Sequence, residues 1–102
     1  MNELTNKQFI EQIAKWKDIV AQSDITLPGG RPIPDKFFHV FLGVGYSTYR
    51  KLANYDNPKG KVPLYTSRMV RFINKLEYSV FLDEIRLSLI DYSNMYLYPT
   101  SR

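Results

Sequence analysis

The sequence predicts an all-α fold: a compact bundle of about five helices that contains a helix-turn-helix. Three observations lead to this prediction. The chain has 102 residues, which is the length of one domain. Its apolar residues recur every three or four positions in several segments, which is the spacing of one helix face. The stretches between those segments are rich in Gly, Pro and Asn, which favour turns. We expect one domain over residues 1–93 and a tail over residues 94–102.

The first expected helix begins at a capping box. Thr5 and Gln8 have the spacing at which a hydroxyl and an amide satisfy the free N–H groups of a first helical turn. An apolar stripe follows at helical spacing, made of Phe9, Ile13, Trp16 and Val20. We therefore expect a helix that ends near residue 22. Three prolines and two glycines make residues 23–34 a turn-rich connector.

Two short helices are expected next, over residues 36–42 and 46–54, joined by Gly-Val-Gly. Asp35 is a suitable N-cap for the first of them. Gly43 falls at the turn, where a left-handed backbone costs little in the absence of a Cβ atom. The inner side chains at helical spacing are Phe38, Leu42, Tyr49 and Leu52. This pattern predicts two helices at a steep angle around a small shared core, which is helix-turn-helix geometry.

Two more helices are expected in the second half of the chain. The inner residues of the first are Leu64, Met69, Phe72, Ile73 and Leu76, and its wetter side carries Arg68, Arg71 and Lys75. The second spans residues 78–90 and is apolar nearly all round, so it needs a second partner. We expect a homodimer through its apolar residues Val80, Phe81, Leu82, Ile85, Leu87, Leu89 and Ile90. The alternative is that the first helix covers both of its faces. The tail beyond it has no helical spacing.

The composition excludes several classes of function. The chain has no cysteine, which excludes a disulfide framework and a thiolate metal site. It has a single histidine, His39, so we expect no metal site. No phosphate-cradling glycine loop or nucleophile elbow is present, so we expect neither an enzyme nor a cofactor. No small-molecule ligand is evident. No apolar run approaches a membrane span of roughly 20 residues. The N-terminal segment lacks the apolar core of a signal peptide, so a cytoplasmic protein is expected.

Positive charge is concentrated in the middle of the chain. Residues 31–75 carry nine basic and two acidic side chains, a net charge of +7. The flanking segments are mildly acidic, at −1 for residues 1–30 and −2 for residues 76–102. A basic block on a small domain suits an acidic polymer such as nucleic acid, although a solvated charged face is the alternative interpretation.

The segment Leu-Gly-Val-Gly-Tyr-Ser-Thr-Tyr-Arg-Lys-Leu, residues 42–52, carries a family resemblance. It resembles the Leu-Gly-Val-Ser-x-Ser-Thr-x-x-Arg-Leu core of helix-turn-helix repressors of the Cro/CI (Xre-like) type. The opening residues and the place of the turn are more weakly similar to plasmid KorA (TrfB-like) repressors. The resemblance implies a transcriptional regulator, a phage or plasmid repressor, that reads double-stranded DNA with the helix over residues 46–54. His39 stands where the family usually has a small residue, so either the two helices are spread or His39 turns outward.

Helical geometry selects the residues that would contact DNA. The exposed side chains of the second short helix are expected to be Tyr46, Ser47, Arg50, Lys51 and Asn54. Arg50 has the planar fork that pairs with guanine, and Asn54 suits adenine. Phosphate contacts are expected from Lys59 and Lys61 in the following loop, and from Arg68 and Arg71 on the fourth helix. One such helix reads too few base pairs, so a twofold dimer on a palindrome is expected.

A protein-interaction module that inhibits a host factor without binding DNA is the alternative function. It would account for the aromatic content of 15% and for the apolar fifth helix. The two functions differ in the dependence of duplex binding on salt, which is steep only for a DNA-binding protein.

Overall fold

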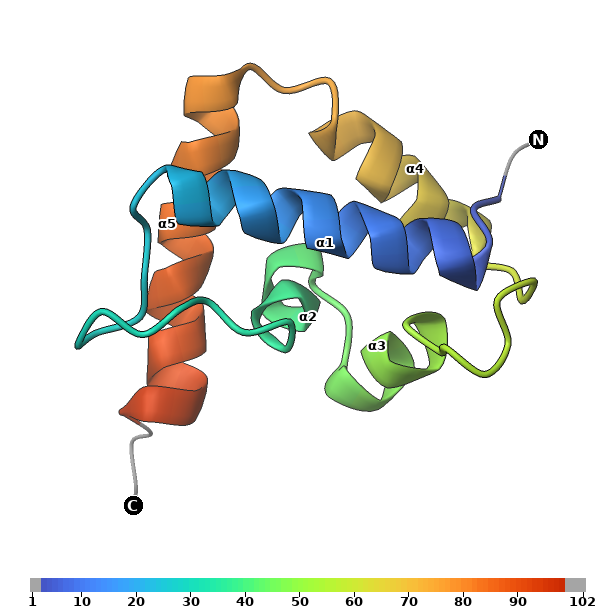
Figure 1. The fold of residues 1–102 in the computed structure, drawn as a ribbon, viewed down its shortest axis with the longest axis horizontal. Coiled ribbons are helices and arrows are strands. Elements are labelled where there is room, and N and C mark those ends of the chain that lie inside the picture. Colours follow the sequence, from blue (N-terminus) through green and yellow to red (C-terminus); the bar gives the residue numbers. More distant parts are fainter. Residues whose placement is uncertain (1–2, 99–102) are drawn as a thin grey trace.

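The structure is a computed structural model that describes residues 3–98, and it confirms the all-α class (Figure 1). The described part of the chain contains five α-helices and a short π-helical segment, with no strand beyond one isolated bridge. The elements are α1 (Asn6–Gln22), α2 (Phe37–Leu42), α3 (Tyr46–Leu52), α4 (Leu64–Ile73), α5 (Tyr78–Tyr92) and η1 (Ser93–Leu97). None of the helices within residues 3–98 is long and apolar enough to cross a membrane.

The long helix α1 runs through the middle of the molecule and begins as predicted. The Thr5 hydroxyl accepts from the Gln8 backbone N–H at 3.2 Å, and the Gln8 side chain accepts from the Thr5 N–H at 2.9 Å. The predicted stripe Phe9, Ile13, Trp16 and Val20 is buried. In Figure 1, α3 and α4 lie on opposite sides of α1, and α5 crosses near its C-terminal end.

The core is largely aromatic and is centred on Trp16. The Trp16 ring lies 6.2 Å from Phe38, 5.7 Å from Phe41 and 6.2 Å from Phe81, measured between ring centroids. Its Nε1 donates to the Asn74 side chain at 2.9 Å, which satisfies the one polar group of the indole. This cluster joins α1, α2 and α5 and fastens the connector that follows α4.

The two short helices form as predicted around a three-residue turn. Gly43 has φ 73° and therefore adopts the predicted left-handed conformation. Tyr49 and Leu52 are buried, as are Phe38 and Leu42. The prediction that Asp35 caps α2 is wrong: Lys36 occupies the N-cap position, and no side chain caps this helix. The Asp35 carboxylate instead pairs with the Lys17 ammonium at 2.8 Å.

The predicted inner face of α4 is largely wrong. Leu64, Met69 and Phe72 are exposed, and the buried residues are Thr66, Ser67, Val70 and Ile73. Ser67 is buried because its hydroxyl accepts from the Leu4 N–H at 3.0 Å and donates to the Val62 carbonyl at 3.2 Å. A hydrogen-bonded hydroxyl is inexpensive to bury, so the apolar pattern of this helix does not identify its inner face.

The tail prediction is also wrong where the structure describes it. Residues 93–97 continue from α5 as the π-helix η1, with the Tyr98 N–H donating to the Ser93 carbonyl at 2.7 Å. Tyr96 and Leu97 are half-buried against the core. A π-helix lacks the 3.6-residue period, so its apolar residues do not show helical spacing. Residues 99–102 of the predicted tail lie outside the described residues.

On α5, the buried residues are Phe81, Leu82, Ile85 and Tyr92. Val80, Leu87 and Ile90 are exposed, so α1 does not cover both faces of this helix.

Candidate nucleic-acid interface

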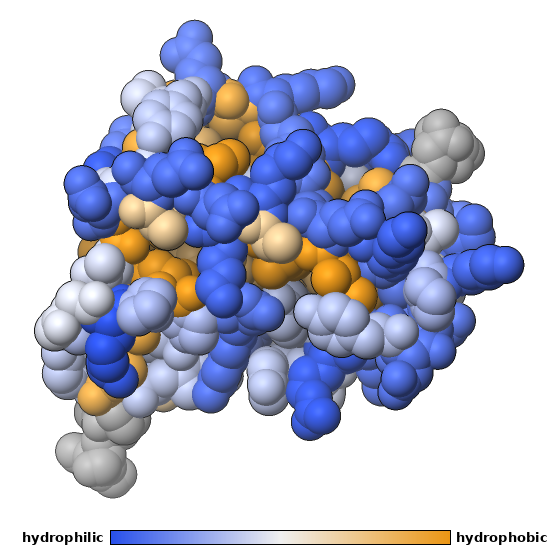
Figure 2. Space-filling view, viewed as in Figure 1, coloured by the Kyte–Doolittle hydropathy of each residue, from blue (hydrophilic) through white to orange (hydrophobic). Residues whose placement is uncertain are grey.

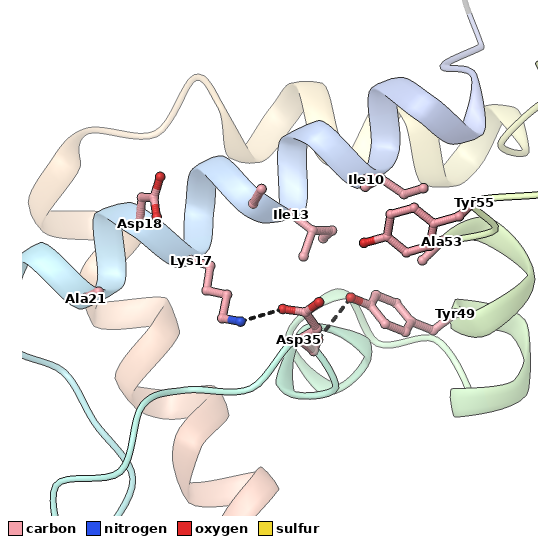
Figure 3. Close-up of a pocket in the computed structure, with 10 residues that line it drawn as sticks. Ile10, Ile13, Lys17, Asp18, Ala21, Asp35, Tyr49, Ala53 and Tyr55 are labelled. Carbon is pink, nitrogen blue, oxygen red and sulfur yellow. Dashed lines mark hydrogen bonds and ion pairs between the residues drawn. The ribbon is translucent and has the colours of Figure 1, made fainter. Parts of the chain in front are cut away.

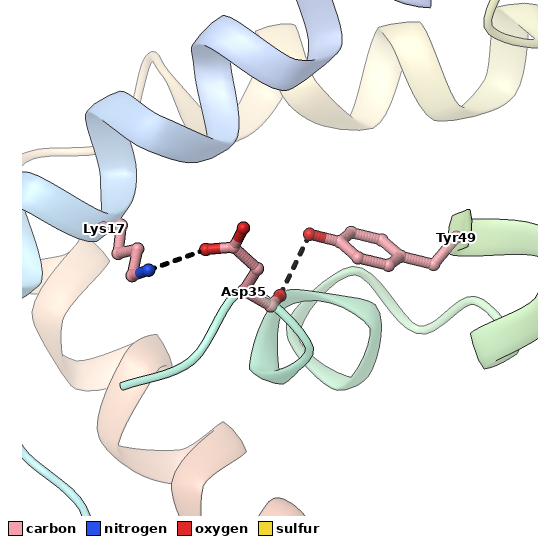
Figure 4. A network of polar contacts seen from close by, with 3 residues as sticks. All are labelled: Lys17, Asp35 and Tyr49. Atoms are coloured by element: carbon pink, nitrogen blue, oxygen red, sulfur yellow. Dashed lines mark hydrogen bonds and ion pairs between the residues drawn. The ribbon is translucent and has the colours of Figure 1, made fainter. Parts of the chain in front are cut away.

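The helix α3 is held at the edge of the molecule by its inner residues. The Tyr49 ring packs edge-on against Phe9 of α1, at 5.9 Å between centroids. Its hydroxyl donates to the Asp35 backbone carbonyl at 2.9 Å (Figure 4). Burial, and to a lesser degree the Asp35 charge, raise the pKa of the Tyr49 hydroxyl well above its ordinary value. These contacts fix α3 to both α1 and α2.

The outer face of α3 brings together four of the predicted contact residues. Tyr46, Ser47, Arg50 and Lys51 are all exposed. At 100° per residue, they occupy one side of the helix, and the buried Tyr49 and Leu52 occupy the other. The fifth predicted residue, Asn54, is not on this surface, because α3 ends at Leu52.

The side chain of Asn54 shapes the loop instead. Its Oδ1 accepts from the Asp56 backbone N–H at 2.9 Å, and the side chain is half-buried. This is the local bond by which asparagine turns a chain. The prediction of a helix that reaches residue 54 is therefore wrong at its C-terminal end.

His39 is buried behind the turn and does not turn outward. Its Nδ1 lies 2.9 Å from the Val44 carbonyl, and its Nε2 lies 2.7 Å from the Tyr96 hydroxyl. A carbonyl only accepts, so Nδ1 carries a hydrogen, and in that tautomer Nε2 accepts from the Tyr96 hydroxyl. His39 thereby joins the turn before α3 to the π-helix η1. The sequence gives no sign of this link, because 57 residues separate the two side chains.

Tyr46 lies in a group of rings and cations at the start of α3. Its ring centroid is 5.4 Å from that of His39 and 6.0 Å from the Arg50 guanidinium carbon. The Lys36 ammonium lies 3.7 Å from the Tyr96 ring centroid and 5.5 Å from that of Tyr46. Cations over ring faces are attracted to them, so the group restrains Tyr46 and Arg50 before any ligand arrives. Lys36 and Tyr96 are contributors that sequence reasoning missed.

The loop lysines Lys59 and Lys61 are exposed, and they lie at the N-terminal end of α1. The loop is fastened there because the Gly60 carbonyl accepts from the Asn6 N–H at 2.7 Å and the Pro58 carbonyl from the Lys7 N–H at 3.1 Å.

Gly60, between the two loop lysines, packs against two asparagine side chains. A Cβ atom at this position would lie 2.5 Å from the Asn6 side-chain nitrogen and 2.7 Å from that of Asn57. A side chain at position 60 would therefore displace these two asparagine side chains.

Arg68 and Arg71 do not join the surface of α3. Both are on α4, which lies across α1 from α3 (Figure 1). Arg68 is exposed and Arg71 is half-buried. The structure thus divides the predicted contact residues among the outer face of α3, the loop at the end of α1, and α4.

A groove of about 360 Å³ opens between α1 and α3 (Figure 3). Ile10 and Ile13 form part of its wall, Tyr55 lies at one end, and the Lys17–Asp35 ion pair lies at the other. Figure 2 shows hydrophobic residues exposed between hydrophilic ones along this strip. Lys17 and Asp35 are paired with each other, and the Tyr49 hydroxyl donates to the Asp35 carbonyl.

Within residues 3–98 no group of three or more acidic or histidine side chains could hold a metal ion. The outer face of α3 is thus an exposed and partly cationic helix face. Comparison of the chain with protein-family models, with curated proteins and with solved structures finds no match. Its function is therefore inferred from the geometry described above.

Proposed function

We propose that this chain is a sequence-specific double-stranded DNA-binding transcription regulator that reads the major groove with α3. The observation that carries the proposal is the pair of short helices α2 and α3, joined by Gly43, Val44 and Gly45, with α3 at the edge of the molecule. A major groove of about 12 Å accepts a helix presented in this way. Arg50 would then read guanine, and Tyr46, Ser47 and Lys51 would contact neighbouring bases or phosphates.

The charge distribution supports the same surface. The net +7 of residues 31–75 includes the cations of α3 and of the loop after it. Lys59 and Lys61 extend from the end of α1 and would contact phosphate. Arg68 and Arg71 are left out of this surface, because α4 lies on the other side of α1.

The proposal includes a homodimer. A single α3 spans too few base pairs for useful selectivity, and a twofold pair on a palindrome doubles the site. Such a regulator, a phage or plasmid repressor, would work in the cytoplasm, where the DNA is.

The test is selection of bound duplexes from a random library, with the wild type, Arg50→Ala and the matched control Lys15→Ala. Lys15 is an exposed cation on α1. We expect the wild type and the control to select the same palindrome, with half-sites about one helical turn apart. Arg50→Ala should lose selection at one base pair per half-site. Failure of the wild type to enrich any sequence would contradict the proposal.

A second candidate function is a protein-interaction module without DNA binding, and the exposed Tyr65, Met69 and Phe72 of α4 favour it. Such a protein would show no steep loss of duplex affinity with salt. Titration of binding to random duplex against salt concentration therefore separates the two functions.

A further inference from the structure

Two exposed apolar faces of this chain carry opposite charges. On α4, Tyr65, Met69 and Phe72 recur at helical spacing away from the core, and Tyr65 and Phe72 are 69% and 65% exposed. Arg68 is exposed one turn before Phe72 on this helix, and Lys75 is exposed in the turn two residues after the helix ends. These five residues are called the α4 face.

The second face lies on α5. Val80, Glu84, Leu87 and Asp91 follow one another at intervals of four, three and four residues, and all are exposed. Ile90 lies beside them, and Leu87 and Ile90 are 56% and 60% exposed. These five residues are called the α5 face. The charged residues of this face are Glu84 and Asp91, so its charge is negative.

We propose that the α4 face of one chain packs on the α5 face of a second copy, and that twofold symmetry makes this contact twice. The inference deepens the homodimer of the proposed function and rests on that part of it alone, not on DNA reading by α3. It keeps the expected role of the fifth helix in the dimer and adds α4 as the surface that this helix meets.

Charge complementarity selects this pairing. Two α5 faces packed together would place four carboxylates in one contact, and two α4 faces would place four cations there. Only the mixed pairing places Arg68 and Lys75 against Glu84 and Asp91. The two large aromatic side chains then occupy the middle of the contact and the charges its rim, which is the usual arrangement of an interface.

The α4 half of this contact lies away from the outer face of α3, whereas the α5 half ends near the turn before α3, where Asp91 and Gly45 line one groove. In Figure 1, α4 lies on the other side of α1 from α3. A partner on α4 therefore does not cover Tyr46, Ser47, Arg50 or Lys51.

The test uses two charge-reversed forms of the full chain. Form A carries Arg68→Glu and Lys75→Glu, and form B carries Glu84→Lys and Asp91→Lys. Mass is measured by analytical ultracentrifugation without DNA. We expect the wild type to be a dimer at micromolar concentration, and the dissociation constant of each form alone to rise about tenfold or more.

An equal mixture of A and B restores both contacts, because each altered face then meets an altered partner of opposite charge. We expect a heterodimer with affinity near that of the wild type. The matched control is Lys7→Glu with Lys15→Glu, which reverses two exposed charges on α1 and should leave the mass unchanged. All substituted residues are exposed, and circular dichroism checks that each form is folded.

Three outcomes would overturn the proposal: a monomeric wild type at tens of micromolar, forms A and B that dimerise as the wild type does, or a mixture that stays monomeric. A monomeric wild type would leave the α4 face to a different protein. Selection of bound duplexes with α3 variants is a separate experiment from the mass measurement. A protein that does not dimerise can therefore be distinguished from one that does not bind DNA.

Discussion

Arg50 illustrates how single residues prepare the surface of α3. Its guanidinium lies 6.0 Å from the Tyr46 ring, and that ring packs against the buried His39. A restrained guanidinium loses less conformational freedom when it binds. The selectivity of α3 is therefore expected to depend on Arg50 more than on Lys51, whose ammonium has no matching fork.

Arg50→Ala should cost roughly 1–3 kcal/mol of binding free energy on the selected duplex and much less on random DNA. Arg50→Lys should keep most of the non-specific affinity and lose discrimination at one base pair. Fluorescence anisotropy with the selected and a scrambled duplex measures both. An equal loss on every duplex would make Arg50 a phosphate contact only.

Tyr96→Phe tests the link between the π-helix and the turn. The substitution leaves the buried Nε2 of His39 without a donor, which should cost about 1–3 kcal/mol of unfolding free energy. Tyr98→Phe is the control, since Tyr98 is exposed nearby and should have no effect. Urea unfolding gives both values, and equal stabilities of the two variants would show that the bond contributes nothing.

The raised pKa of Tyr49 predicts a loss of stability in alkali. In the unfolded chain the tyrosine hydroxyl ionises near pH 10, while burial keeps it protonated in the folded chain. Above pH 10 the unfolded state therefore binds fewer protons, and the unfolding free energy falls as the pH rises. Tyr49→Phe should make this fall shallower. Urea midpoints at several pH values check the slope, and parallel profiles would refute the assignment to Tyr49.

The turn between α2 and α3 contains two glycines, Gly43 and Gly45, whose substitutions can be compared directly. Gly43 has φ 73°, Gly45 has φ −65°, and a Cβ atom at either position would meet nothing within 4 Å. Gly43→Ala should therefore cost about 1–2 kcal/mol of stability through backbone strain alone. Gly45→Ala should cost less, roughly 0.5 kcal/mol, because Gly45 has an ordinary φ and the change only replaces the N-cap of α3 by a poorer one. Thermal unfolding compares the two, and an equal shift would mean that the left-handed turn carries no strain.

The elements that could be predicted are those whose signals are local. The Thr5–Gln8 box and the Gly43 turn each lie within a few residues, and both were located correctly from the sequence. The inner face of α4 depends on Ser67, whose partner Leu4 is 63 residues away, and no local pattern contains that information. The same holds for His39 and Tyr96. The outer face of α3 can be predicted because it lies opposite a local apolar stripe. The position of α4 relative to α3 cannot, because it depends on contacts between distant parts of the chain.

Across the whole molecule, the basic middle segment is divided between two sides of α1. The helices α3 and α4, which both carry cations of this segment, lie on opposite sides of α1 (Figure 1). The expected binding of DNA therefore uses only part of the net +7.

Lys59→Ala with Lys61→Ala should weaken binding to every duplex about equally and lower the salt slope by roughly two. Lys15→Ala with Arg86→Ala is the control, since both residues are outside the basic segment. Lys7 is left out of this control because it lies beside the loop, at the start of α1. The slopes come from affinity measured at several salt concentrations, and equal losses from both pairs would contradict the orientation proposed for the complex.

The position of Trp16 has an optical consequence. It is the only tryptophan of the chain, it is 1% exposed, and it is packed among three rings from α2 and α5. Its emission should therefore be blue-shifted in the folded chain and move to longer wavelength only when the core opens. Since the indole is buried away from the outer face of α3, the emission should stay unchanged when duplex is added. Every variant named above can thus have its folding followed by intrinsic fluorescence in the same cuvette in which binding is measured with a labelled duplex.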